Sequence, residues 1–247
     1  MNDPWHNLRR FTQARIAQGH AGCGLPTEAS LDFELAHALA RDAIHQPWDI
    51  ERFAEEATLI GLEPLCLSTP VAGRVQYLQR PDLGRCLDEV SRQTLLERQQ
   101  PAVDVALVIS NGLSSIAVER HGLALLKAIV AVYQDIPLRC GPVCLVPNAR
   151  VALADQIGAL LNARLSVIVV GERPGLSAAD SLGIYLTYAP QVGRTDAERN
   201  CISNIRPPEG MSYQAAAAKL AYLSYEALQR GLSGVGLKDD MPKQLLD

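Results

Sequence analysis

The chain has 247 residues, and its 23 lysines and arginines against 27 aspartates and glutamates give a net charge of −4 at neutral pH. This mild acidity provides no global basic field, which argues against a nucleic acid or an anionic membrane surface as partner. Six cysteines are too few for a disulfide scaffold. No apolar run approaches the roughly 18 residues of a membrane span, and the N-terminus shows no apolar secretory signal. We therefore expect a cytoplasmic protein.

The first hundred residues are predicted to form a helical N-terminal region, residues 1–100. Helices are expected over residues 7–18, from Thr27 to just before Pro47, over 50–59 and over 83–99. Residues 71–78 could form a short strand, and the region shows no other strand pattern.

The remainder of the chain, residues 101–247, alternates between apolar β-branched runs and helical patterns. Strands are predicted at 103–110, 141–147, 165–175 and 184–190, and helices at 116–133, 151–161 and 212–231, the last capped by Ser212 and Gly231. This alternation is typical of parallel strands joined by helical crossovers. It predicts an α/β domain, a Rossmann-like parallel sheet flanked by helices.

Ligands of such sheets bind beyond the carboxyl ends of the strands. Three loops are therefore candidates for a site: 110–115, 147–151 and 171–175. Glu172 directly follows the strand IVVG, where its carboxylate could accept hydrogen bonds from a ligand; the alternative is a surface ion pair with Arg173. Residues 193–210 are predicted to be an irregular polar loop, with Cys201 and Ile202 as apolar anchors that favour binding.

No set of residues for complete catalysis or metal binding stands out. Cys140 and Cys144 form a C-x-x-x-C pair without further ligands, so a buried structural thiol is the favoured interpretation of Cys144. Ser110-Asn111-Gly112 follows a strand, but the chain lacks both G-x-G-x-x-G and a Walker lysine. A capped turn and an anion contact both stay open for it. We predict no catalytic residue and no metal ligand, which favours a cofactor or nucleotide binder, or one subunit of a larger enzyme.

Over residues 7–240 the chain resembles the small (light) subunit family of ethanolamine ammonia-lyase. The resemblance is carried above all by GERPGL (171–176) and NCISNIRP (200–207), with further matches in LRRFTQARIAQGHAG, LPTEASLDFELAHALARDAIH, YLQRPDLGRCL and VALVISNGLSS. It implies participation in the adenosylcobalamin-dependent conversion of ethanolamine to acetaldehyde and ammonia by a radical route. The substrate and the radical chemistry then lie in a barrel-type large subunit, and the small subunit helps to hold the corrinoid.

The resemblance also implies three cobalamin-binding residues: Val151, Glu172 and Cys201. A carboxylate can accept bonds from the amide rim of a corrin, while Val151 and Cys201 can contact that rim. The D-x-H-x-x-G motif of base-off cobalamin domains is absent, so no histidine is expected to bind cobalt.

The expected partner is the large subunit, in a heteromer of several large–small pairs. Only about six residues precede the first helical pattern, so the amphipathic tail that directs some family members into a bacterial microcompartment is not expected. A cytoplasmic location is expected, with a microcompartment possible through the partner. The alternatives are a non-enzymatic corrinoid carrier or sensor, a dinucleotide enzyme and a structural scaffold subunit.

Overall fold

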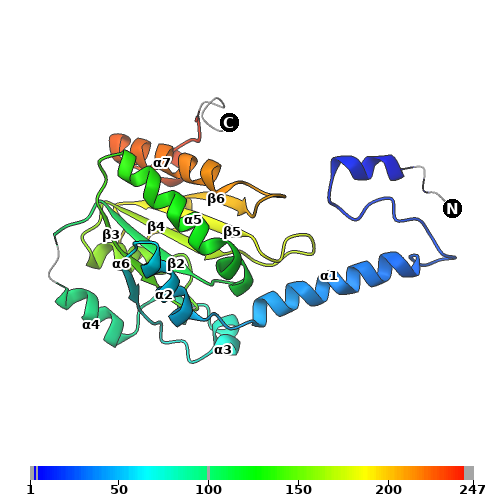
Figure 1. The fold of residues 1–247 in the computed structure, drawn as a ribbon, viewed down its shortest axis with the longest axis horizontal. Helices are drawn as coiled ribbons and strands as arrows, with labels where there is room; N and C mark the ends of the chain where they lie inside the picture. Colours follow the sequence, from blue (N-terminus) through cyan, green and yellow to red (C-terminus); the bar gives the residue numbers. More distant parts are fainter. Residues whose placement is uncertain (1–2, 4, 99–100, 242–247) are drawn as a thin grey trace.

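A six-stranded sheet forms the centre of the computed structural model, which describes residues 3, 5–98 and 101–241 (Figure 1). Its strands lie in the order β1-β3-β2-β4-β5-β6. Their bounds are β1 Pro64–Cys66, β2 Val105–Ser110, β3 Cys140–Leu145, β4 Leu165–Gly171, β5 Leu182–Tyr188 and β6 Arg199–Ile205. The first four are mutually parallel, whereas β5 runs antiparallel to both β4 and β6. The predicted α/β class is confirmed, with a mixed rather than wholly parallel sheet.

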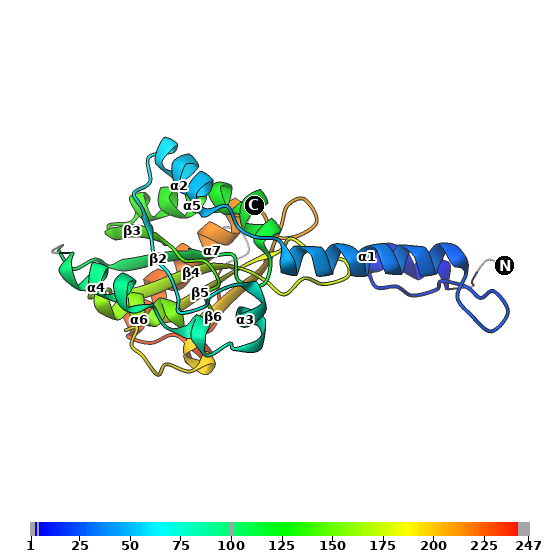
Figure 2. The same cartoon turned by 90° about the horizontal axis from the view of Figure 1, so that it is seen from below.

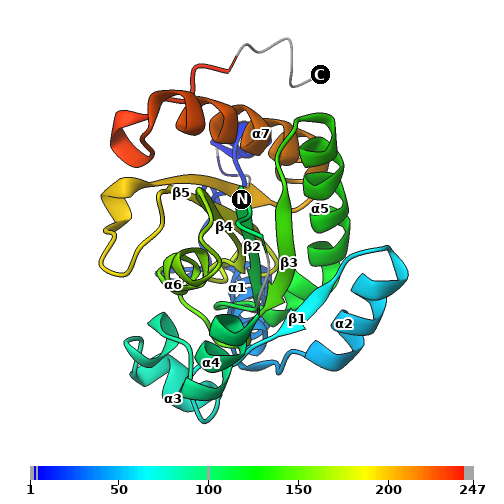
Figure 3. The ribbon, with the colours of Figure 1, turned by 90° about the vertical axis from the view of Figure 1, so that its left-hand side faces the viewer.

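Helices cover both faces of the sheet, as an end-on view shows (Figure 3). Their bounds are α1 Thr27–His45, α2 Ile50–Leu59, α3 Arg74–Gln79, α4 Glu89–Glu97, α5 Ser115–Asp135, α6 Leu153–Leu160 and α7 Tyr213–Arg230. One core joins α2, α5 and α7 to the sheet, and a second joins α4 and α6 to the opposite face. Strands β2 and β4 are buried along their whole length because they are covered on both sides. The caps Ser212 and Gly231 of α7 are as predicted.

The antiparallel direction of β5 follows from its short connection to β4. A parallel crossover requires a dozen or more residues, usually including a helix. Residues 172–181 hold no helix and return directly, so that Gly171 pairs with Leu182. Because β6 reverses again, the carboxyl ends of β1, β2, β3, β4 and β6 lie at one edge of the sheet.

Two predicted elements have a different secondary structure. Residues 71–78 are not a strand, since α3 spans Arg74–Gln79; Tyr77 is buried there while Val75 is 63% exposed, which an alternating strand face does not allow. Residues 193–210 are not an irregular loop either, because they contain β6. The prediction missed β6 because its polar residues have buried partners from distant parts of the chain.

Three differences concern the N-terminal region. The strand β1 pairs with β3, although residues 64–66 gave no strand signal. The expected helix 7–18 is a 3₁₀ helix over His6–Phe11 only. The expected helix 83–99 is divided into a 3₁₀ turn, Leu83–Arg85, and α4, because the Asp88 carboxylate caps α4 by accepting from Ser91 N. The proposed division of the chain at residue 100 stays a prediction.

The helix α1 projects away from the sheet, and the segment before it runs back alongside (Figure 2). Only Ala40 and Ala43 of α1 are buried. Its leucine ridge, consisting of Leu31, Leu35 and Leu39, is more than half exposed. We refer to α1 together with the described residues before it as the arm. No helix within the described ranges is long and apolar enough to cross a membrane.

Candidate functional site at the carboxyl edge of the sheet

The three loops proposed from the sequence meet at the carboxyl edge. Leu113 N donates to Gly171 O at 2.9 Å, and Asn148 N donates to the Asn111 side chain at 2.7 Å. The buried Ser110 hydroxyl accepts from Ala149 N at 3.0 Å. These bonds connect the ends of β2, β3 and β4. Ser110 and Asn111 therefore have structural roles in joining the loops, and they present no open phosphate cradle.

Glu172 is held in one orientation by the neighbouring strands. Its Oε2 accepts from the Ser181 hydroxyl at 2.5 Å and from Asn204 N at 3.2 Å. A Cβ on Gly183 would lie 2.9 Å from Oε1, so glycine provides room for the carboxylate. Glu172 forms no ion pair with Arg173 among the described residues. The carboxylate thus keeps acceptor capacity at Oε1.

Glu172 and Val151 line one cavity of about 410 Å³, which we call the Glu172 cavity. Leu113, Val170 and Tyr185 contribute to its wall. It combines apolar side chains with one carboxylate, that of Glu172, and with the guanidinium groups of Arg150 and Arg173. This composition is typical of a site that orients a ligand through few polar contacts.

Cys201 does not line the Glu172 cavity directly. It pairs across the sheet with Tyr185, whose side chain is part of the cavity wall. Partial burial raises the pKa of the Cys201 thiol, against a hydrogen bond from Tyr185 that lowers it. A thiol with a raised pKa is a poor nucleophile. Val151 and Glu172 therefore share a cavity at the carboxyl edge, whereas Cys201 lies within β6, four residues before its carboxyl end, beside Tyr185 of the cavity wall.

The sequence reasoning missed Tyr185, Arg150 and Tyr77 as parts of this region. The Arg150 guanidinium lies 4.2 Å from the centre of the Tyr77 ring, and the Tyr77 hydroxyl donates to Ala149 O at 3.1 Å. The position of Arg150, directly before Val151 at the end of a strand, was the available signal. Tyr185 gave only the alternation of a strand.

The cysteine pair and the histidines offer no second centre. Burial raises the pKa of Cys140 to about 11 and that of Cys144 to about 12, in keeping with a structural thiol at Cys144. His121 is buried, and its Nδ1 lies 2.7 Å from the Tyr213 hydroxyl. Among the described residues, no group of three His, Cys, Asp or Glu is arranged to hold a metal ion.

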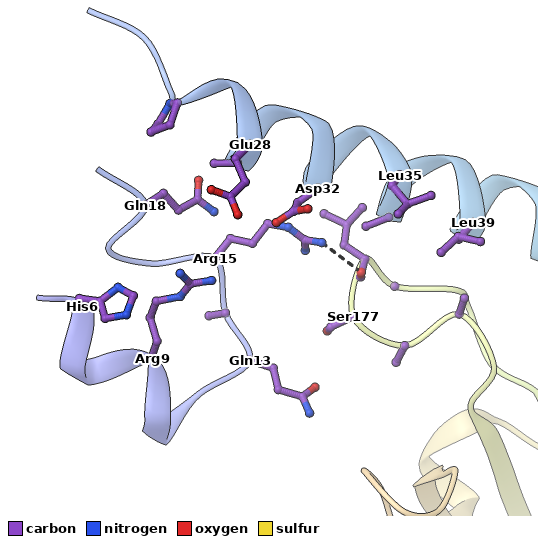
Figure 4. Close-up of a pocket in the computed structure, with 18 residues that line it drawn as sticks. His6, Arg9, Gln13, Arg15, Gln18, Glu28, Asp32, Leu35, Leu39 and Ser177 are labelled. Atoms are coloured by element: carbon purple, nitrogen blue, oxygen red, sulfur yellow. Dashed lines mark hydrogen bonds between the residues drawn. The ribbon is translucent and has the colours of Figure 1, made fainter. Parts of the chain in front are cut away.

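A larger hollow of about 680 Å³ lies between the arm and the β4–β5 loop (Figure 4). Arg15 reaches across it and donates to Leu176 O at 3.4 Å. Leu35 and Leu39 of the leucine ridge form part of its wall. None of the three predicted site residues lies there.

Below the carboxyl edge, a buried ion pair fixes β6 against α6. Arg199 Nη1 lies 2.5 Å from Asp155 Oδ2, and both side chains are only 2% exposed. The same guanidinium donates to Thr187 Oγ1 and to Arg194 O. This network fixes the position of β6. The strand carries Cys201 and also Asn204, whose N–H donates to Glu172.

Comparison with known proteins gives a consistent result over nearly the whole chain. A family model described as "Ethanolamine ammonia-lyase light chain" matches residues 2–238. The chain is 52% identical over 242 residues to the "Ethanolamine ammonia-lyase small subunit" of Pseudomonas putida KT2440, covering 97% of this chain and 89% of the relative. It is 51% identical over 248 residues to the protein of the same name from Pseudomonas aeruginosa LESB58, covering 99% and 90%.

Proposed function

The chain belongs to the ethanolamine ammonia-lyase light-chain family, and from this membership we propose that it acts as the small subunit of an adenosylcobalamin-dependent ethanolamine ammonia-lyase. In this role it completes the cobalamin site at the interface with a large subunit. The observation that supports the proposal best is that Val151 and Glu172 line one cavity at the carboxyl edge, with Cys201 beside Tyr185 of its wall.

The residues at the carboxyl edge fit part of a corrinoid. The Glu172 cavity offers an apolar wall beside an acceptor, which suits a ring with an apolar face and a rim of amide donors. A cavity of about 410 Å³ accommodates a ligand no larger than a typical drug. A corrinoid is larger, so a second chain must cover most of it. This mismatch in size favours a shared site over a stand-alone carrier.

Each residue of this chain then has a defined task. Glu172 accepts amide N–H groups, and Val151 and Cys201 contact the rim and exclude water. When bound, the cobalamin supplies the adenosyl radical through homolysis of its cobalt–carbon bond. The chain's own residues bind and orient the cofactor, while ethanolamine binds in the large subunit.

The direct test is co-expression with the large subunit and an assay for acetaldehyde release from ethanolamine with added adenosylcobalamin. Activity is expected only when both chains are present. Equal activity of the large subunit alone would refute the proposal. Tight cobalamin binding by the isolated chain, without a large subunit, would favour a corrinoid carrier or sensor instead.

Replacing Glu172 with glutamine is expected to weaken cobalamin binding to the assembled complex by about 1–3 kcal/mol. Ser181 and Asn204 both donate to Oε2, so the side-chain carbonyl oxygen of the E172Q variant must take that place. The amide nitrogen then occupies the position of Oε1 and presents a donor where a ligand amide needs an acceptor. The measurement is the cobalamin dissociation constant by absorbance titration.

The matched control is Glu55→Gln, on an exposed position of α2 on the opposite face of the sheet. It is expected to leave cobalamin affinity unchanged. If Glu172→Gln binds cobalamin as tightly as the wild type, Glu172 does not contact the cofactor.

The arm is our candidate for contact with the large subunit. Its leucine ridge is more than half exposed in the described chain, and exposed apolar surface of this kind marks interaction sites. The relatives are named small subunits, a name that implies a large subunit. We propose that the large subunit binds this surface.

Replacing Leu35 with aspartate is expected to weaken assembly by about 2 kcal/mol, roughly a thirtyfold loss in affinity, because a charge would be buried at the interface. The readout is the dissociation constant of the two subunits. Leu59→Asp is the control, since Leu59 is an equally apolar, 86% exposed residue on α2. Equal affinity of the Leu35→Asp variant and the wild type would exclude the ridge from the interface.

A further inference from the structure

Three arginines at the carboxyl edge lack a carboxylate partner. Arg150 lines the Glu172 cavity and also a neighbouring cavity of about 440 Å³, which we call the Arg85 cavity. Arg85 lies in the second cavity and Arg173 in the first. Within the described part of the chain, none of the three forms an ion pair. The edge is thus locally positive in a chain that is acidic as a whole.

The other two arginines of the Arg85 cavity are already neutralised. Arg194 pairs with Glu198 at 2.5 Å, and Arg199 pairs with Asp155. Asp196, the acidic residue in this wall, lies 3.3 Å from Arg199. No carboxylate of the cavity is therefore directed at Arg85 or Arg150.

The side chain of Arg150 is fixed in place by contacts with neighbouring residues. Its guanidinium stacks on the Tyr77 ring, its Nη2 donates to Tyr77 O at 3.1 Å, and its backbone N donates to Gly84 O at 2.7 Å. Its buried Nε has no hydrogen-bond partner in the described chain. A buried donor without a partner is unfavourable and calls for an explanation. Arg74 stacks on the same ring, which adds a second positive charge behind Arg150.

We propose that Arg150, assisted by Arg85, binds a phosphodiester, and that this is the phosphodiester of the nucleotide loop of the bound corrinoid. The inference rests on the proposed function. A guanidinium presents a planar fork that matches phosphate geometry, and it loses little hydration on pairing. Glu172 and Arg150 lie in the wall of the same cavity. One site thus offers an acceptor for amide donors and a cation for a phosphate, the two polar features that a complete corrinoid carries together.

The test compares cyanocobalamin with dicyanocobinamide, which keeps the amide-rimmed ring but lacks the nucleotide loop and its phosphate. Both are titrated against the assembled large–small complex, and their dissociation constants are measured by absorbance. For Arg150→Met we expect a roughly tenfold loss of cyanocobalamin affinity, the size of one charge-assisted contact, and less than a twofold change for dicyanocobinamide. Added salt should weaken cyanocobalamin binding less in this variant than in the wild type.

Two further variants distinguish a lost contact with the phosphate from misfolding of the Arg150→Met variant. Arg85 is exposed and its side chain forms no ion pair in the described chain, so Arg85→Gln leaves the fold intact; a smaller loss, also confined to cyanocobalamin, is expected. Lys127→Gln is the matched control, because Lys127 is an exposed cation on α5, on the opposite face of the sheet. It should change neither constant.

Several results would overturn the inference. Equal losses for both corrinoids in Arg150→Met and Arg85→Gln would mean that the arginines only maintain the site. If these variants keep their affinity for both corrinoids but assemble more weakly with the large subunit, the anion that the arginines bind is a carboxylate of the large subunit and not a phosphate. If the wild-type complex binds neither corrinoid, the proposed function itself fails, and the inference fails with it.

Discussion

Replacing Arg199 with leucine is expected to lower the free energy of unfolding by about 3–5 kcal/mol. The change removes the guanidinium but leaves the Asp155 carboxylate, which is 2% exposed, without its countercharge. It also removes the donors to Thr187 and to Arg194 O, which hold the beginning of β6. Urea denaturation of the purified chain gives the measurement.

Two control variants test whether the loss of stability comes from the buried Arg199–Asp155 pair or from removal of any arginine. Arg164→Leu removes a half-exposed arginine that lies 3.2 Å from Asp104, and a surface pair of this kind contributes less than about 1 kcal/mol. The double variant Asp155→Leu/Arg199→Leu should be more stable than Arg199→Leu alone, since it leaves no unpaired buried charge. A loss below about 1 kcal/mol in Arg199→Leu would show that the pair does not hold β6.

Replacing Gly171 with alanine is expected to cost about 3 kcal/mol, the upper part of the range for overpacking. A Cβ at this position would lie 2.2 Å from Ser114 O and 2.5 Å from Asn111 O. Both obstacles are backbone atoms of the loop after β2, so one of the two loops must move. The displacement would also shift Glu172, the next residue, and cobalamin affinity should fall with stability.

The control position is Gly175, four residues after Gly171 in the connection between β4 and β5. A Cβ on Gly175 would meet only Ala178 O at 3.8 Å, an ordinary contact distance. Gly175→Ala should therefore retain both stability and cobalamin affinity. Thermal unfolding and absorbance titration of each variant provide the two readouts. If Gly171→Ala behaves like Gly175→Ala, the contact between the loops is not needed for the site.

The positions of Glu172 and Val151 in the fold could be predicted because they depend on topology more than on contacts. Buried parallel strands give continuous apolar runs, and the residues that follow them meet at one edge. Glu172 and Val151 were placed at that edge by this rule alone, and they share a cavity. The rule needs only the strand positions, which the apolar pattern supplies.

The remaining features depend on pairings between distant residues, which a single sequence does not reveal. The strand β6 has polar residues at positions that are normally apolar, and Arg199 is buried only because Asp155, 44 residues before it, supplies the countercharge. Tyr185 became part of the cavity because β5 reverses direction. The role proposed for Arg150 depends on its forming no ion pair among the described residues, which becomes visible only in the folded chain.

The projecting arm has a consequence for the strength of assembly. The 19 residues of α1, at about 1.5 Å each, form a helix about 28 Å long, whose C-terminal end packs on the domain through Ala40 and Ala43. In the complex that we propose, the chain would touch its partner through both the arm and the carboxyl edge, and so bind at two linked points. The second contact then forms at a high effective concentration once the first is made. Weak individual contacts can in this way give a long-lived complex, and cofactor exchange can proceed by release of one contact while the other persists.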